Sequence, residues 1–207
     1  MLALPGVRIW RELKGEPCIE FEDGFEAKQS ICVSRSFSHE ISDLDQLCEQ
    51  IANFAASMSE KLRQQRTVAS EMNVFAYTNR FKENDPQIYS TQLVHFEHPI
   101  NDARTMVSAA VAAMKEAYRK GYGYKKAGVV ATHILNEKDV VPSLFEDTTN
   151  IEREQRITSA VDVINATFGK GTVKLATQGS GHIQSSSEKQ SPHYTTLWDD
   201  IPKVSVK

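Results

Sequence analysis

The residues of this 207-residue chain best suited to chemistry are hydroxyls and cations, not acids placed for catalysis. Ser34, Arg35 and Ser36 follow one another in the run KQSICVSRSF, and Lys125 and Lys126 form a second cluster. Hydroxyls, backbone N–H groups and cationic side chains are the donors with which proteins hold phosphate oxygens. The pattern indicates a phosphate-binding surface; the alternative is an ordinary half-exposed strand near residues 30–37.

Patterns for metal or nucleotide chemistry are weak in this sequence. Asp199 and Asp200 are adjacent but flanked by Trp198 and Pro202, as in a solvated turn, and paired divalent ions need converging carboxylates. His95 and His98 have no third ligand nearby in the sequence. The glycines of 169–171 and 179–181 lack the GxxxxGK[ST] spacing of a phosphate loop. We therefore expect no catalytic residue, no metal and no cofactor in this chain.

Cysteine usage and hydropathy indicate a cytoplasmic protein. The three cysteines, Cys18, Cys32 and Cys48, are odd in number, and none has a partner at metal-ligand spacing. No run approaches the roughly 18 apolar residues of a membrane span. The first residues lack the basic start and apolar core of a secretory signal.

Charge is unevenly distributed along the chain. The net charge is −3, yet residues 27–135 hold 13 Lys/Arg against 11 Asp/Glu, and both flanking parts are acidic. A mildly basic middle is compatible with nucleic-acid contact, although the excess alone does not establish it.

The elements that must position these residues follow the order β-α-β-β-α-β. The sequence predicts strands near 30–37, 71–81, 88–97 and 124–136. It predicts helices over 42–66 and 101–121, each with one apolar stripe. Ser42 is the predicted N-cap of the first helix, Asp102 lies near the start of the second, and Gly121 is its predicted C-cap.

The predicted fold is an α+β domain in which two helices cover one face of a four-stranded antiparallel sheet. The other face is then open. Hydroxyls, amides and cations lie on it or at its rim: Ser34, Arg35, Ser36, Asn79, Arg80, Lys125 and Lys126. An open sheet with cations along it is suited to a polyanion.

The C-terminal third predicts a looser organisation. A third helix is expected over 151–169 with Ile157, Ala160, Val161 and Ile164 inward, and a turn with a short strand over 169–179. Between this helix and the fourth strand, VVPSLFED places Leu144 and Phe145 in a loop-like stretch. Two large apolar side chains there either fold onto their own domain or occupy a partner's pocket.

Several stretches, in their order along the chain, resemble one family: RELKGEPC, KQSICVSRSF, EKLR, YKKAGV and SPHYTTLWDDIP. They are similar to the C-terminal part of the UmuC-type proteins, the catalytic subunits of bacterial translesion DNA polymerase V. These proteins belong to the Y family of polymerases, with the MucB, ImpB and SamB relatives. The likeness extends over nearly the whole chain.

The resemblance implies a division into four parts. Residues 1–28 are the end of the thumb region and a linker, and 29–137 are the little finger, a DNA-binding domain whose open sheet lies against template–primer DNA. Residues 138–150 are a linker with a clamp-binding-like peptide, and 151–207 are a C-terminal extension. The family's catalytic palm and its Mg²⁺-holding acids match nothing here, so this chain alone is expected to be inactive.

The resemblance also implies roles for individual residues. Ser34, Arg35 and Ser36 would contact the template backbone, with Arg80, Lys125 and Lys126 as further phosphate contacts. The family binds the processivity clamp through a peptide of the general pattern Gln-Leu-x-Leu-Phe. The residues in that place are Val141, Pro142, Ser143, Leu144 and Phe145, of which the last two match and the first two depart.

The predicted function is therefore a non-catalytic segment of an error-prone polymerase in SOS DNA repair. It grips primer-template DNA and binds the sliding clamp. The alternative is a protein-interaction module for a UmuD-like subunit, a RecA filament or the clamp, with little DNA affinity. The sequence contains no convergent polar site that would indicate a small-ligand or enzyme domain.

Overall fold

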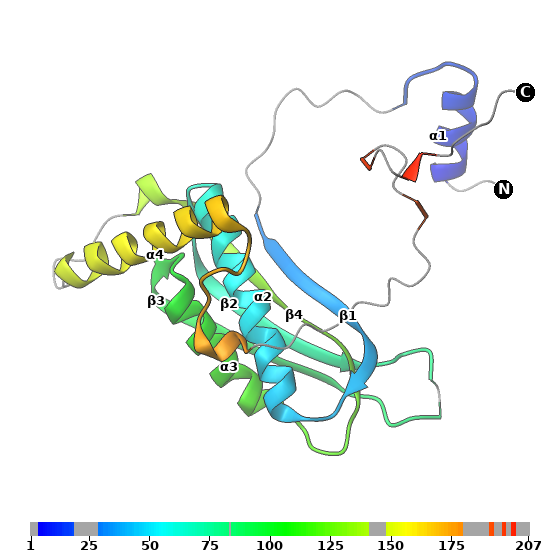
Figure 1. The fold of residues 1–207 in the computed structure, drawn as a ribbon. Coiled ribbons are helices and arrows are strands. Elements are labelled where there is room, and N and C mark those ends of the chain that lie inside the picture. The colour runs from blue at the N-terminus through cyan, green and yellow to red at the C-terminus, as the bar shows by residue number, and fades with distance from the viewer. Residues whose placement is uncertain are drawn as a thin grey trace, which may run out of the picture.

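A four-stranded antiparallel sheet is the centre of the computed structural model (Figure 1), which describes residues 4–18, 29–82, 84–140, 148–179, 191–192, 196–197 and 200–201. The strands are β1 (Ile31–Ile41), β2 (Thr67–Thr78), β3 (Tyr89–Ile100) and β4 (Tyr124–Asn136), in the spatial order β1-β4-β2-β3. The last strand is thus inserted between the first and the second. The α+β fold with the order β-α-β-β-α-β is confirmed.

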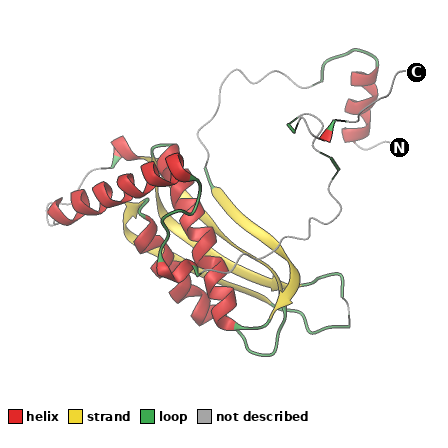
Figure 2. Cartoon of the chain, viewed as in Figure 1, coloured by secondary structure: helices red, strands yellow, loops and turns green. Residues whose placement is uncertain are grey.

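Two helices, α2 (Leu44–Gln64) and α3 (Ala103–Ala117), lie side by side across one face of the sheet (Figure 2). Each begins at an aspartate whose side chain accepts a backbone N–H three residues on: Asp43 from Gln46 and Asp102 from Thr105, both at 2.8 Å. The prediction of Ser42 as N-cap was therefore wrong by one residue. The predicted C-cap at Gly121 was also wrong, because Tyr118 already adopts an extended ψ of 139° and ends α3.

The core lies between this helix layer and the sheet. Met72, Val74 and Val129 project from the central strands, and alternation along a strand sends every second side chain to this side. The fully buried helix residues that meet them include Leu47, Ile51, Leu62, Met106 and Met114. Buried Tyr124 is satisfied at its hydroxyl, which lies 3.2 Å from Ser90 Oγ and accepts the Arg119 backbone N–H at 2.9 Å.

The opposite face of the sheet is covered by no helix of the described part of the chain (Figure 2). We call this surface the open face. On each of the four strands, the side chains of the open face are those that alternate with the core side chains, and the strand register places them side by side. The predicted open sheet is present.

The C-terminal helix α4 (Thr148–Phe168) lies against the ends of the helix layer and not on the open face (Figure 1). Arg63 in α2 grips Asp162 in α4 with two bonds, Nε–Oδ2 at 2.6 Å and Nη2–Oδ1 at 2.8 Å. Arg104 in α3 reaches Glu154 at 3.2 Å. Of the four residues predicted to face inward, Val161 and Ile164 are half-buried, whereas Ile157 and Ala160 are exposed, so the prediction was wrong for these two. The contacts that hold α4 include the polar side chains of Asp162 and Glu154.

A short 3₁₀ turn, η2 (Ala176–Gln178), follows α4, and the strand predicted within 169–179 is absent from this described segment. Gln178 of η2 is hydrogen-bonded to α2 through both its backbone carbonyl and its side-chain amide. Asn53 donates to the Gln178 carbonyl at 2.9 Å and accepts from its side-chain amide at 3.2 Å. Leu175 packs against the core, so the chain after α4 returns along the helix layer.

Two further short elements complete the described chain. The N-terminal helix α1 (Leu4–Leu13) buries none of its residues, and Lys14 lies over its Trp10 ring at 3.9 Å. The 3₁₀ turn η1 (Glu137–Asp139) follows β4. No described helix is long and apolar enough to cross a membrane.

Candidate nucleic-acid interface

The open face is a grid of side chains fixed by strand register. The first row, at one end, consists of Ser36 of β1, Lys126 of β4, Tyr77 of β2 and Tyr89 of β3, each paired with the next across the sheet. The next row holds Ser34, Gly128, Phe75 and Thr91, and the third holds Cys32, Val130, Asn73 and Leu93. Because side chains two apart on a strand share a face, all three rows lie on the same surface.

Two predicted cations come together at the first row. The Arg80 guanidinium carbon lies 5.0 Å from the centre of the Tyr77 ring, and the Lys126 ammonium lies 5.9 Å from it. Arg80 belongs to the turn after β2, whereas Lys126 belongs to β4, so the sheet register brings them to one place. A cation over an aromatic ring keeps its charge available to an anion on its other side.

The two remaining predicted cations lie elsewhere. Arg35 is exposed, but it pairs with the core residue Ala127 and so alternates to the helix-covered side of the edge strand β1. Lys125 is the extra residue of a bulge in β4, and its ammonium donates to the Ser38 carbonyl at 3.0 Å. Lys125 therefore holds the irregular end of β1 in place.

Ser34 and Ser36 do lie on the open face, as predicted for the backbone-contact run. Ser34 sits directly against Gly128 of β4: a Cβ added at Gly128 would lie 2.8 Å from both Ser34 Cα and the Val33 carbonyl oxygen, and closer still to Ser34 Cβ. The absence of a side chain at Gly128 lets β1 approach β4 at this row.

Lys82 lies near this end of the sheet but is already bound. Its ammonium is 2.8 Å from Glu40 and 3.4 Å from Asp85. The hydrogen bond and charge of Glu40 raise the pKa of Lys82 above its usual value. Lys82 thus ties the turn after β2 to β1 and adds little free positive charge.

Sequence reasoning missed the aromatic side chains of the open face, Phe75, Tyr77 and Tyr89. Phe75 and Tyr77 are two residues apart in β2, which predicts a shared face. The spacing could not show which face was open, nor that Tyr89 of β3 pairs with Tyr77.

At the far end of the open face, one carboxylate joins three side chains. Glu71 lies 3.1 Å from His95 Nδ1 and 2.9 Å from His133 Nδ1, and Thr132 donates to it at 3.3 Å. His133 has a φ of 51°, which interrupts strand alternation and lets its ring reach the same carboxylate as Thr132. His95 therefore pairs with Glu71 across the strands, a partner that the His95/His98 spacing did not indicate.

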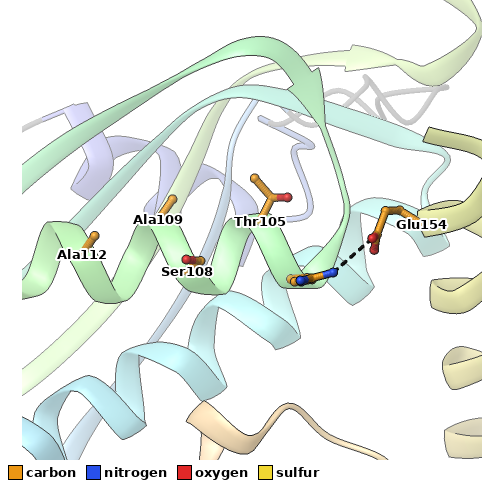
Figure 3. Close-up of a pocket in the computed structure, with 6 residues that line it drawn as sticks. Thr105, Ser108, Ala109, Ala112 and Glu154 are labelled. Carbon is orange, nitrogen blue, oxygen red and sulfur yellow. Dashed lines mark hydrogen bonds and ion pairs between the residues drawn. The ribbon is translucent and has the colours of Figure 1, made fainter. Parts of the chain in front are cut away.

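A separate hollow of about 460 Å³ lies on the helix side, along the outer face of α3 (Figure 3). It is lined by Thr105, Ser108, Ala109 and Ala112, and the Arg104–Glu154 ion pair lies at one end. Within the described ranges, no group of three His, Cys, Asp or Glu side chains could hold a metal ion.

The predicted clamp-binding residues, Val141 to Phe145, lie outside the described residues. Their role stays a prediction from sequence.

Comparison with known sequences identifies the family. The impB/mucB/samB family C-terminal domain matches residues 28–144, more than half of the chain. The chain belongs to this family. A second match, to a domain of unknown function (DUF4113), covers residues 155–204, which include most of α4 and η2.

Individual relatives agree with this assignment. The chain is 33% identical to protein UmuC of Salmonella typhimurium over 95% of its own length and 47% of the relative's. It is 33% identical to protein ImpB of Salmonella typhimurium, covering 94% and 46%, and 32% identical to protein MucB of Escherichia coli, covering 97% and 47%. The chain thus spans about half the length of the curated relatives that it matches.

One solved structure is similar at a lower level. It is the complex of the β-clamp processivity factor with the little finger domain of PolIV, at 15% identity and a TM-score of 0.38, covering 56% of this chain and 93% of that chain. At this level the likeness supports no conclusion about function.

Proposed function

We propose that this chain is a DNA-holding, non-catalytic segment of an error-prone translesion polymerase acting in SOS DNA repair. The observation that carries the proposal is the convergence of Arg80 and Lys126 on the open face, with Ser34 and Ser36 in the adjoining positions of the edge strand. Side chains of these types are common ligands of phosphate oxygens, and contacts to phosphates carry no sequence information. A grip of this kind tolerates damaged template bases.

The chemistry of nucleotidyl transfer is left to the part of the longer polymerase that this chain does not contain. There, Mg²⁺ would be held by the acidic residues of the catalytic palm. The residues of this chain bind and orient the primer-template.

Titration of a labelled primer-template duplex, followed by fluorescence anisotropy, tests the DNA grip. Arg80→Ala and Lys126→Ala should each weaken binding and each reduce the slope of log K against log salt by about 0.9. Lys170→Ala is the matched control, because its ammonium pairs with Glu60 on the helix side. Equal effects of all three variants would reject the open face as the DNA-holding surface.

The clamp tether is a second part of the proposal and is supported by the sequence alone. Leu144 and Phe145 retain the apolar end of the clamp-binding pattern, whereas Val141 and Pro142 replace its Gln and Leu. Loss of the Gln amide removes a hydrogen-bonding group, so weak binding is expected. Leu144→Ala/Phe145→Ala should abolish capture by the sliding clamp without changing duplex affinity.

A protein-interaction function is the alternative, and exposed apolar residues on α4 favour it. Ile157, Val163 and Phe168 are 48%, 65% and 75% exposed. A UmuD-like subunit or a RecA filament would cover them. Two results together would favour this alternative. The parent chain would pull down either partner and Val163→Ser/Phe168→Ser would not, and duplex affinity would be unchanged by Arg80→Ala and Lys126→Ala.

A further inference from the structure

Three aromatic rings on the open face form a cluster that a backbone grip does not require. We call Phe75, Tyr77 and Tyr89 the aromatic triad. The ring centres are 6.2 Å apart for Phe75–Tyr77, 6.4 Å for Phe75–Tyr89 and 5.9 Å for Tyr77–Tyr89, with planes within 24° of each other. Each ring is nearly equidistant from the other two, so the triad is a triangle and not a column.

The three rings are in different environments. Phe75 is 8% exposed although no described helix covers its side of the sheet; the Tyr77 and Tyr89 rings lie beside it, and Gly128 is its partner on β4. Tyr77 is half-buried and has Arg80 and Lys126 near its ring. Tyr89, on the edge strand β3, is 52% exposed. Tyr89 is therefore the ring of the triad most accessible to a ligand.

The surroundings of the triad suit a polyanion with flat apolar parts. Two cations lie at Tyr77, and the adjoining positions carry small polar side chains, including Thr91, which donates to Asn73 at 2.7 Å. The nearest carboxylate in register, Glu71, lies three rows away and is bound to His95 and His133. An apolar protein surface would gain nothing from the cations, whereas a nucleic-acid strand uses both features.

Aromatic side chains on open sheets bind unpaired bases by stacking, while nearby cations follow the sugar-phosphate chain. In the interior of a duplex both faces of each base are covered by neighbouring bases, so an accessible Tyr89 ring there can stack only on a base that has left the helix. We infer that the open face also binds single-stranded DNA, with an unpaired base stacked on Tyr89 and the adjacent phosphates at Arg80 and Lys126. The inference rests on the proposed DNA-holding function and adds unpaired template as a second ligand.

The test compares two labelled 12-nucleotide strands of equal charge in fluorescence anisotropy with the 207-residue chain: oligo-dT and a strand of the same length whose residues are abasic. The parent should bind oligo-dT more tightly by about 5- to 150-fold, equivalent to ~1–3 kcal/mol for one stacked base. Tyr89→Leu should remove this difference, and Tyr89→Phe should keep it. Neither variant should alter the salt dependence, because neither changes a charge.

The outcomes separate this inference from the proposed function. Equal binding of oligo-dT and the abasic strand by the parent would overturn the stacking, as would a Tyr89→Leu variant that retains the preference. Duplex affinity that is unchanged in Arg80→Ala and in Lys126→Ala would instead reject the proposed DNA-holding function. An oligo-U arm distinguishes DNA from RNA: tighter binding of oligo-U than of oligo-dT would overturn the choice of DNA. Circular dichroism melting checks that the exposed Tyr89 tolerates both substitutions.

Discussion

At the scale of single residues, the open face depends on one glycine. Gly128 pairs with Ser34 on one side and Phe75 on the other, and it has no side chain to separate either neighbour from β4. A close approach of backbone to backbone is a common reason for glycine within a strand. The same position therefore sets how closely β1 approaches β4, and on its other side it is the register partner of Phe75.

Gly128→Ala should destabilise the fold by about 2–3 kcal/mol, because the new Cβ meets the backbone of β1 and not a movable side chain. Gly123→Ala is the control: its Cβ meets the Glu40 side chain, at 2.8 Å from Oε2, and turning that side chain costs no more than its exposed ion pair with Lys82. Urea unfolding followed by circular dichroism measures both. Equal losses of unfolding free energy in the two variants would show that β1 adjusts freely at Ser34.

Two cysteines on neighbouring elements should differ in reactivity. Burial raises the pKa of the Cys48 thiol, against the opposing charge of Lys115, whereas Cys32 is exposed on β1. The thiolate is the reactive form, so Cys48 should remain unmodified near pH 8 while Cys32 is alkylated. Because the folded pKa is raised, the thiol form favours the fold at and below neutral pH, and this contribution is lost as pH rises through the folded pKa.

Timed alkylation with mass spectrometry measures the difference between the two thiols. Cys48 should become reactive only when urea unfolds the chain. Alkylation of both cysteines at similar rates in the folded chain would contradict the burial of Cys48.

At the scale of elements, α4 is held by a polar clamp. Arg63 uses three nitrogens, binding Asp162 twice, the Asn101 carbonyl at 2.7 Å and the Ser59 hydroxyl. Its side chain is 17% exposed, so the bidentate pair is better shielded from water than a surface ion pair. The clamp joins α2, the turn before α3, and α4.

A double-mutant cycle of Arg63→Ala and Asp162→Ala should give a coupling energy of about 1–2 kcal/mol. Asp162→Ala alone should be costly, since it leaves a mostly buried guanidinium without its carboxylate. Amide hydrogen exchange of α4 is the local measurement. The exposed pair Arg104–Glu154 is the control and should couple by less than about 1 kcal/mol.

Much of the element pattern could be predicted from sequence, because apolar stripes and period-two alternation report directly on burial. The spatial order of the strands could not, since no local pattern shows that β4 enters between β1 and β2. The meeting of Lys126, Tyr77 and Tyr89 in one row follows only from that order. The exposed Ile157 was mispredicted because an apolar stripe along a helix does not show which partners the helix contacts. In α4 those contacts include the ion pairs of Asp162 and Glu154.

At the scale of the whole molecule, the core is complete without the C-terminal extension. All buried hydrophobic residues of the described part lie between Ile31 and Ala131. A chain ending at residue 140 should therefore still unfold cooperatively, at a urea midpoint lowered by loss of the Arg63 clamp and of the Leu175 contact. A broad, non-cooperative transition in circular dichroism would show that α4 and η2 are needed to complete the fold.

The insertion of β4 between β1 and β2 also governs the order in which the sheet can assemble. β2 and β3 are neighbours in sequence and can pair as a hairpin, but β1 has no partner in the sheet except β4. During synthesis, β1 must therefore wait until about a hundred further residues have been made. Such long-range pairing slows folding, typically to milliseconds or seconds in domains rich in nonlocal contacts. Until then its exposed edge is open to other chains, so newly made protein is at greatest risk of misassociation just before β4 emerges.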